Sequence, residues 1–172
     1  MDNFKDLRKK FSKLYDQYID KIYRFIFFKV NSEEITKDLC SETFLRGWEA
    51  FKKSKVEEIE NPSAFLYQIA RNLVIDFYRE KGKAQIVSAE YGRIIDPRVN
   101  LEERANKSSE FYQAKQALSN LKDDYQEIIV LRYLDDLSVS EIAKIVDKSE
   151  NAVRVTLHRA LKALKNELNS TV

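Results

Sequence analysis

Chemically reactive side chains are few in this sequence, and their scarcity argues against several kinds of enzyme. The 172 residues include one histidine, His158, and one cysteine, Cys40. One residue of each type supplies neither a zinc site nor a disulfide, and we expect no Cys/His catalytic pair. His158 has no carboxylate or nucleophile within reach on its predicted helix. We therefore expect no catalytic residue, no metal site and no cofactor, and a protein that is not an enzyme by itself.

Paired acids, which could act as a general acid and base, occur at Asp123-Asp124 and at Asp135-Asp136. Each pair lies where a predicted helix starts or ends. Because acidic side chains are common capping groups, we interpret both pairs as caps rather than as catalytic groups.

Polar side chains suited to nucleic acid gather on one face of the segment 150–168. At about 100° per residue, the apolar residues occupy one half of a helix. They are Ala152, Val153, Thr156, Leu157, Ala160, Leu161 and Leu164. The opposite side carries Asn151, Arg154, Val155, His158, Lys162 and Lys165. Such amide, guanidinium, imidazole and ammonium groups can contact base edges and phosphates, although a solvated amphipathic helix is the alternative.

Two further helix faces are candidates for binding. In the segment 62–81, one side carries Gln68, Arg71, Asn72, Ile75 and Arg79. This face could follow the phosphates of a single strand and read an unstacked base. Tyr67 and Tyr78 could stack on bases, but aromatic residues at helical spacing are more often in the core. In the segment 33–53, the outer side carries Asp38, Ser41, Glu42, Leu45 and Glu49. A leucine among acids indicates a protein interface, or else a surface helix with one stray leucine.

The elements that position these faces are predicted to be helices. With 3 glycines and 2 prolines, the chain does not favour β-rich folds or glycine-rich phosphate loops. Apolar residues three and four apart predict a first helix from Phe4 to about Val30. Ser32 is the expected cap of a second helix that runs to about Lys53, and Asn61-Pro62 starts a third that stops at Gly82.

Helical periodicity weakens from Gly82 to about Glu110 and then returns. We expect helices over 111–121 and 124–134, a capping box at Ser138–Glu141 that opens a helix to Val146, and a last helix capped by Ser149. The fold class is therefore all-α, with two small helical domains (1–82 and 113–172) joined by a flexible linker (83–112). The spacing of the last two helices is that of a helix-turn-helix. The stretch 113–147 is net acidic and 148–172 net basic, a polarity common in nucleic-acid readers.

Long apolar segments are missing from the sequence. No run approaches 18 residues, so we expect neither a signal peptide nor a membrane-spanning helix, and the lone cysteine fits a reducing compartment. A cytoplasmic protein without membrane insertion is the resulting expectation.

Several of these segments resemble one family. The stretches 131–146 (LRYLDDLSVSEIAKIV) and 151–161 (NAVRVTLHRAL) resemble region 4 of bacterial sigma factors. Residues 38–51 (DLCSETFLRGWEAF) resemble region 2.2, and residues 62–79 (PSAFLYQIARNLVIDFYR) resemble regions 2.3 and 2.4. Primary sigma factors carry further domains before and between these regions, so the pattern resembles the extracytoplasmic-function (ECF) class.

The resemblance implies a role for each face. Region 2 would bind the coiled coil of the polymerase β′ subunit through Asp38, Ser41, Glu42 and Leu45, although Ser41 replaces the glutamine that is common there. It would open the minus-ten element and capture non-template bases through Gln68, Arg71, Asn72, Asp76 and Arg79. Region 4 would contact the minus-thirty-five element through Asn151, Arg154, Val155, His158, Arg159 and Lys162.

The implied partners are core RNA polymerase, bound at its β′ coiled coil and β flap, promoter DNA and an anti-sigma factor, and the implied role is stress- or envelope-responsive transcription initiation. The alternative is a helix-turn-helix regulator that binds duplex DNA without polymerase and dimerises through its N-terminal domain. An RNA-binding or nuclease module is a third reading, but the sequence has no cluster of metal-ligating carboxylates to support it.

Overall fold

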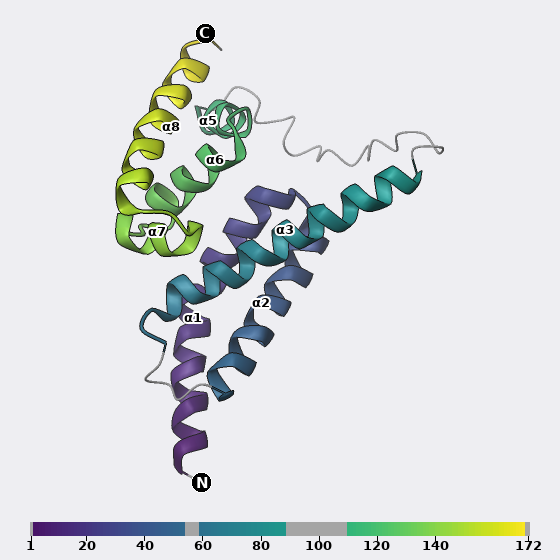
Figure 1. Ribbon diagram of the computed structural model, residues 1–172, viewed down its shortest axis with the longest axis vertical. Helices are drawn as coiled ribbons and strands as arrows, with labels where there is room; N and C mark the ends of the chain where they lie inside the picture. The colour runs from purple at the N-terminus through teal and green to yellow at the C-terminus, as the bar shows by residue number, and fades with distance from the viewer. Residues whose placement is uncertain (1, 54–58, 89–109, 171–172) are drawn as a thin grey trace. The chain divides into compact units, whose positions relative to one another are not determined.

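The structure is a computed structural model that describes residues 2–53, 59–88 and 110–170 (Figure 1). Its internal contacts divide the chain into two units. The N-terminal unit contains α1, α2 and α3, and the C-terminal unit contains α5, α6, η2, α8 and most of α7. Within the described ranges every regular element is helical, as the sequence predicts.

Three long helices form the N-terminal unit: α1 (Asp2–Val30), α2 (Glu33–Lys53) and α3 (Pro62–Ser88). Asn31 ends α1 in the left-handed conformation, with φ 49°, and lets the chain reverse within two residues. Antiparallel packing of α1 on α2 follows from this short connection.

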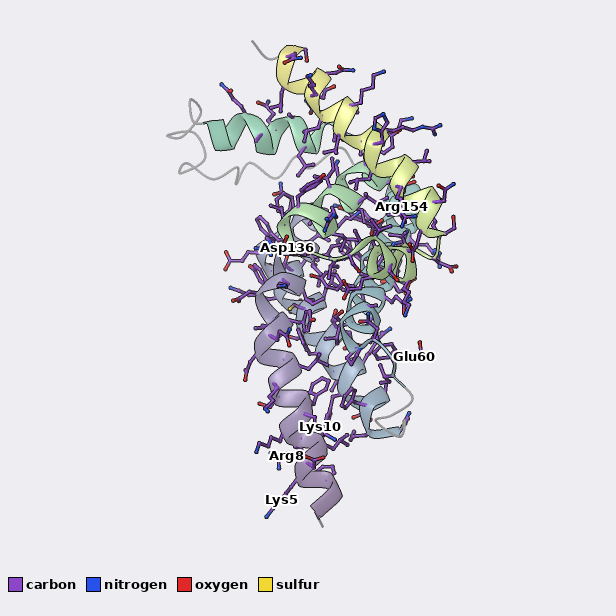
Figure 2. All side chains as sticks on the ribbon, turned by 90° about the vertical axis from the view of Figure 1, so that its left-hand side faces the viewer. Lys5, Arg8, Lys10, Glu60, Asp136 and Arg154 are labelled. Atoms are coloured by element: carbon purple, nitrogen blue, oxygen red, sulfur yellow. The ribbon has the colours of Figure 1, made fainter. Side chains whose placement is uncertain are left out.

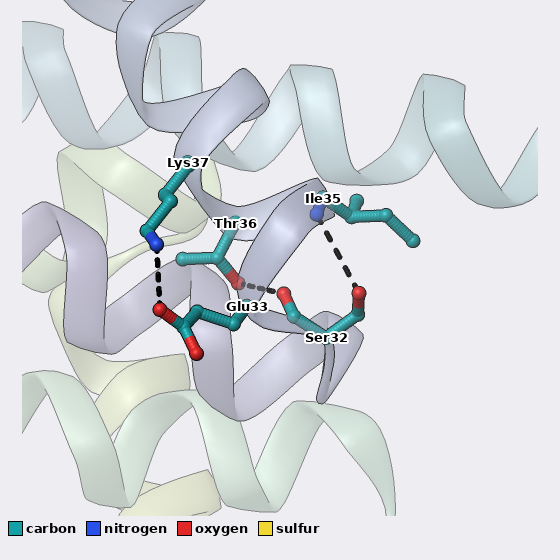
Figure 3. Close-up of polar contacts among 5 residues, drawn as sticks. All are labelled: Ser32, Glu33, Ile35, Thr36 and Lys37. Carbon is teal, nitrogen blue, oxygen red and sulfur yellow. Dashed lines mark hydrogen bonds and ion pairs between the residues drawn. The ribbon is translucent and has the colours of Figure 1, made fainter. Parts of the chain in front are cut away.

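The start of α2 is held by polar contacts (Figure 3). The Ser32 side chain accepts a bond from the N–H of Ile35 at 3.5 Å, and Thr36 donates its hydroxyl to the Ser32 carbonyl at 2.6 Å. Lys37 and Glu33 form an ion pair at 2.6 Å. Their mutual hydrogen bond, and then their opposite charges, lower the pKa of Glu33 and raise the pKa of Lys37. The predicted cap at Ser32 is confirmed.

The core of this unit is apolar and closely packed. Its buried side chains include Ile22, Phe25, Ile26, Cys40, Phe44, Phe51, Leu66, Ala70 and Leu73. Gly47 lies where α2 approaches α3, and a Cβ atom at this position would be 2.8 Å from Cδ2 of Leu66. The lack of a side chain at Gly47 therefore permits the close packing of these two helices.

The end of α3 differs from the expectation. Asn61 caps the helix as predicted, with its Oδ1 accepting the N–H of Ala64 at 3.0 Å. However, α3 continues through Gly82 to Ser88, so the predicted stop at Gly82 is wrong. A glycine ends a helix when it adopts positive φ, and Gly82 does not. The rest of the predicted linker, 89–109, lies outside the described residues.

The C-terminal unit begins with α5 (Glu110–Ser119) and α6 (Asp123–Ile129), and its last helices are α7 (Val139–Val146) and α8 (Glu150–Ser170). The capping box at the start of α7 is confirmed, because Ser138 and Glu141 each bond the other's backbone N–H, at 3.2 and 2.9 Å. Asp147 turns the chain with φ 54°, and Ser149 then caps α8 by accepting the N–H of Ala152 at 3.1 Å. These contacts make the predicted helix-turn-helix.

Between α6 and α7 lies a π-helix, η2 (Val130–Leu134), where the sequence predicts an ordinary helix. The N–H of Asp135 bonds the carbonyl of Val130 at 3.1 Å, which is a five-residue step instead of four. Tyr133 and Leu134 are exposed, whereas Leu137 is buried. Hydrophobic spacing does not distinguish this wider turn from an α-helix.

The paired acids have different local roles. Asp135 is the C-cap of η2, and Asp136 turns the chain with φ 56°. Asp123 and Asp124 lie in the first turn of α6, and the cap position belongs to Lys122, which makes no side-chain capping bond. The capping interpretation is therefore wrong for the first pair, whose carboxylates instead lie near the positive end of the helix dipole.

Candidate functional site

The outer face of α2 carries carboxylates around an exposed leucine. Leu45 is 55% exposed, and Asp38 and Ser41 are also exposed. Glu42 is half-buried and accepts a hydrogen bond from Nε of Arg46 at 2.6 Å. This surface has the apolar centre and charged surround of a protein-binding face.

Cys40 lies on the opposite, buried side of α2. Burial raises the pKa of its thiol to about 11. The thiol is therefore protonated at neutral pH and is a poor nucleophile and a poor metal ligand. Among the described residues, no cluster of histidine, cysteine and acidic side chains could hold a metal ion.

The outer face of α3 is polar. Asn72, Asp76 and Arg79 are exposed, and Gln68 and Arg71 are half-buried. Arg79 lies 3.5 Å from the carboxylate of Asp76, one turn earlier in the helix. The arrangement offers an amide and guanidinium groups side by side on one surface, which suits a base edge and its neighbouring phosphates.

The two tyrosines of α3 have different environments. Tyr67 is buried, and its ring meets that of Phe25 edge to face at 5.5 Å. Tyr78 is 46% exposed, and its hydroxyl donates to the carbonyl of Lys29 in α1. Tyr67 therefore belongs to the core, whereas the Tyr78 ring is accessible and held in place.

A cleft between α2 and α3 brings together residues from two of the candidate faces. Its volume is about 410 Å³, and its lining includes Leu39 and Arg46 from α2 and Asp76, Phe77 and Arg79 from α3. Sequence reasoning missed Arg46. Its position one turn after Glu42 was visible in the sequence, but its place opposite Asp76 and Arg79 depends on the packing of α2 on α3.

The outer face of α8 is exposed along its length. Exposed residues include Asn151, Arg154, Val155, His158, Arg159, Lys162 and Lys165. Val153 and Ala160 are buried on the other side, as predicted. Leu161 departs from the expectation, because it is 38% exposed although its position on the wheel assigns it to the apolar half.

Arg154 is held in place at the start of α8. Its guanidinium donates to the carboxylate of Glu150 at 2.8 Å, and both side chains are largely exposed. The side chain of Val155 beside it is 42% exposed. A guanidinium and a branched apolar group next to each other can recognise a guanine edge and a thymine methyl.

No helix in the described part of the chain is long and apolar enough to cross a membrane.

Two family models match the chain, one in each of its two units. "Sigma-70 region 2" matches residues 14–84, which include the outer faces of α2 and α3. "Sigma-70, region 4" matches residues 112–164, which include the helix-turn-helix. The fold and its exposed helix faces are therefore those of sigma-70-type transcription factors.

Named relatives narrow this class. The ECF RNA polymerase sigma factor BldN of Streptomyces coelicolor is 32% identical over 155 residues, which are 90% of this chain and 58% of BldN. The ECF RNA polymerase sigma factor SigW of Bacillus subtilis is 31% identical over 168 residues, which are 92% of this chain and 88% of SigW. The chain belongs to the ECF family of RNA polymerase sigma factors.

Solved structures share the fold. The sigma factor RpoE of Bartonella quintana, in complex with the anti-sigma factor NepR, matches with a TM-score of 0.74 and 20% identity over 94% of this chain and 98% of RpoE. CnrH, in complex with the cytosolic domain of CnrY, matches with a TM-score of 0.67 and 21% identity over 96% of this chain and 91% of CnrH.

Proposed function

We propose that this sigma factor divides promoter-directed initiation among its three exposed helix faces. The outer face of α2 holds core RNA polymerase, that of α3 captures the opened minus-ten strand, and that of α8 reads the minus-thirty-five element. The observation that best supports this proposal is the exposure of Leu45 among the carboxylates of Asp38 and Glu42. All three residues lie inside the match to sigma-70 region 2. A stand-alone regulator of duplex DNA would not need this face.

The proposed domain limits are 1–82 for region 2, 83–112 for the linker and 113–172 for region 4. The family matches, which end at residue 84 and resume at residue 112, support this division. The last six residues of α3 and the first three of α5 then belong to the linker segment.

Minus-ten capture rests on the chemistry of α3. Asn72 can form two hydrogen bonds to the edge of an unstacked base, while Arg79 and Arg71 contact phosphates. Arg46 adds a further guanidinium to the lining of the cleft that Arg79 also lines. In the free protein Arg46 and Arg79 face acids of their own helices, and exposed pairs of this kind are worth little, so phosphates can replace these partners at low cost.

Reading of the minus-thirty-five element rests on α8. Asn151, Arg154, Val155, His158 and Arg159 occupy its first three turns, where a recognition helix meets base edges. Lys162 lies further along and contacts phosphate.

The chemistry of transcription belongs to the polymerase, and this chain has no catalytic activity of its own. It acts in the cytoplasm, where core polymerase is found, and an anti-sigma factor restrains it by covering the α2 face and the recognition helix. The complexes with NepR and CnrY support a partner of this kind.

The deciding experiment is run-off transcription with purified core polymerase over a library of promoters. Co-purification with core polymerase and initiation at two-part promoters are expected. A dimer that binds a palindrome without polymerase and starts no specific transcript would overturn the proposal in favour of the stand-alone regulator.

A further inference from the structure

An aromatic surface lies on the N-terminal part of α1, outside the residues assigned so far. Phe4 is 53% exposed and Tyr15 is 42% exposed, although both are large side chains. The half-buried Trp48 of α2 lies beside Phe4, with 6.1 Å between the ring centroids. Tyr15 and Trp48 also line a hollow of about 210 Å³, together with Arg8. Phe4, Tyr15 and Trp48 are called the aromatic patch below.

Contacts with the core of the N-terminal unit hold the aromatic patch in place. The ring of Phe11 packs on Trp48 at 5.2 Å and on the buried Phe51 at 5.5 Å. The ring of Tyr15 packs on the buried Phe44 at 4.7 Å. The patch therefore presents a fixed aromatic surface to solvent.

Basic side chains surround the aromatic patch. Lys5, Arg8 and Lys10 project from the N-terminal half of α1 (Figure 2). Lys52 of α2 lies 5.7 Å from the centre of the Trp48 ring. Residues 4–16 contain five basic and two acidic side chains, which give this stretch a net charge of +3. The surroundings of the patch therefore favour an anionic ligand.

Acidic side chains offset part of this charge. Lys10 pairs with Asp6 at 2.9 Å, and Lys52 pairs with Glu49 at 2.6 Å. Ion pairs at the surface contribute little, so another anion can compete for these two lysines. Lys5 and Arg8 form no ion pair within the ranges that the structure describes, and both are exposed.

We infer that the aromatic patch binds the headgroup layer of an anionic phospholipid membrane as a peripheral contact. Tryptophan and tyrosine are enriched at membrane–water interfaces, because each has an apolar body and a polar tip. Lysine and arginine side chains beside such rings extend their charged ends to lipid phosphates. In this arrangement the three rings lie at the level of the headgroups, and Lys5, Arg8 and Lys52 contact phosphate. The inference goes beyond the proposed function and does not depend on the polymerase or DNA contacts.

A nucleic acid strand would use only part of this surface. Its phosphates could contact Lys5 and Arg8, but successive bases stack on open, parallel ring faces. The ring planes of Phe4 and Trp48 are 64° apart, and those of Tyr15 and Phe44 are 63° apart. A lipid layer covers exposed aromatic area without requiring such platforms. The combination of tilted rings and basic side chains therefore favours a membrane surface.

The first test uses the intrinsic fluorescence of the full-length chain. Trp48 is the single tryptophan of the 172 residues, so its emission reports on the aromatic patch. The probes are vesicles of phosphatidylglycerol and phosphatidylcholine in equal parts, and vesicles of phosphatidylcholine alone. The anionic vesicles are expected to shift the emission to shorter wavelength, and to quench it when their acyl chains are brominated near the headgroup. An unchanged emission with anionic vesicles, or an equal response to both kinds of vesicle, would overturn the inference.

The second test measures vesicle binding of variants by co-sedimentation. Lys5→Glu with Arg8→Glu reverses two exposed charges beside the patch, and Phe4→Ser removes an exposed ring. Lys81→Glu with Lys122→Glu is the matched control, because it changes the net charge equally at exposed residues outside the patch. We expect binding to anionic vesicles to weaken about tenfold for the charge variant and about fivefold for Phe4→Ser. The control should change by less than about twofold.

Two further outcomes would contradict a membrane contact at this place. If the patch variants bind anionic vesicles as the control does, another basic surface holds the lipid and the inference is wrong. The same variants are also measured with core polymerase and with a single-stranded oligonucleotide. Weaker binding to either of these, with native binding to vesicles, would assign the patch to that partner instead. The vesicle assays contain neither polymerase nor DNA, so their failure leaves the proposed function standing.

Discussion

The guanidinium of Arg154 donates to the carboxylate of Glu150 at 2.8 Å, one turn earlier on the recognition helix. An exposed pair of this kind adds little to stability. In the free protein the pair places the guanidinium beside Glu150, at the exposed start of α8. If Arg154 reads a base, as proposed above, Glu150 is expected to help position it.

Arg154→Ala is expected to cost about 1–3 kcal/mol and to relax preference at one minus-thirty-five position. Glu150→Gln is expected to act at the same position with a smaller effect, since Arg154 remains. Competition transcription over single-base variants at two salt concentrations is the measurement. Lys162→Ala serves as the comparison. Loss of a phosphate contact should weaken binding evenly across the promoter variants and lower the salt slope by about one unit. If Arg154→Ala loses the same activity on every promoter variant, Arg154 contacts the DNA backbone and not a base.

Charge reversal of the α2 face is expected to weaken polymerase binding. Asp38→Lys with Glu42→Lys should reduce affinity by about 2–5 kcal/mol if the pairs are desolvated, or mainly slow association if they stay at the rim. Circular dichroism should show an unchanged helix content, because neither side chain is in the core. Asp20→Lys, the same kind of charge reversal at an exposed residue of α1, is the control. Native affinity in the double variant would remove the assignment.

Promoter opening is expected to depend on α3 in two ways. Asn72→Ala should reduce discrimination at one minus-ten position if the amide reads a base edge as proposed, while Arg79→Ala should weaken strand capture uniformly. Permanganate footprinting on linear and premelted templates separates these effects. If Asn72→Ala keeps native base preference and native opening, a different residue reads the base.

The capping box of α7 makes a local contribution to stability. Ser138→Ala removes the side chain that accepts the N–H of Glu141 at 3.2 Å, and should lower the free energy of unfolding by about 1 kcal/mol. Urea denaturation measures this loss. Ser140→Ala, on the exposed side of the same helix, should change stability much less. Equal losses in the two variants would argue against a capping contribution.

Cys40 should make stability depend on alkaline pH. Burial raises the pKa of its thiol in the folded chain to about 11, whereas an unperturbed cysteine thiol has a pKa of 9.0. As the pH rises, the unfolded chain therefore loses this proton before the folded chain does. The stability contributed by the protonated thiol is fully present below about pH 9 and is lost as the pH rises to about 11. The stability difference between the native chain and Cys40→Ala should shrink over this interval in urea titrations. A difference that is constant with pH would show that the thiol does not titrate in this way.

Local sequence signals predicted most of the helix starts. The caps at Ser138, Ser149 and Asn61 each depend on a bond to a backbone N–H three residues later, so a short stretch of sequence contains the whole interaction. The exposed faces of α2, α3 and α8 follow from the same local periodicity.

Other features depended on tertiary structure. A glycine such as Gly82 can continue or end a helix, because it adopts negative and positive φ about equally well; here its φ is not positive. The π-helix of Val130–Leu134 has the same apolar spacing as an α-helix, and the burial of Leu137 beyond it accompanies the wider turn. Arg46 lines one cleft with Asp76 and Arg79 only because α2 packs on α3. Periodicity determines which side of a helix is apolar, whereas packing between helices decides which polar groups share a cleft.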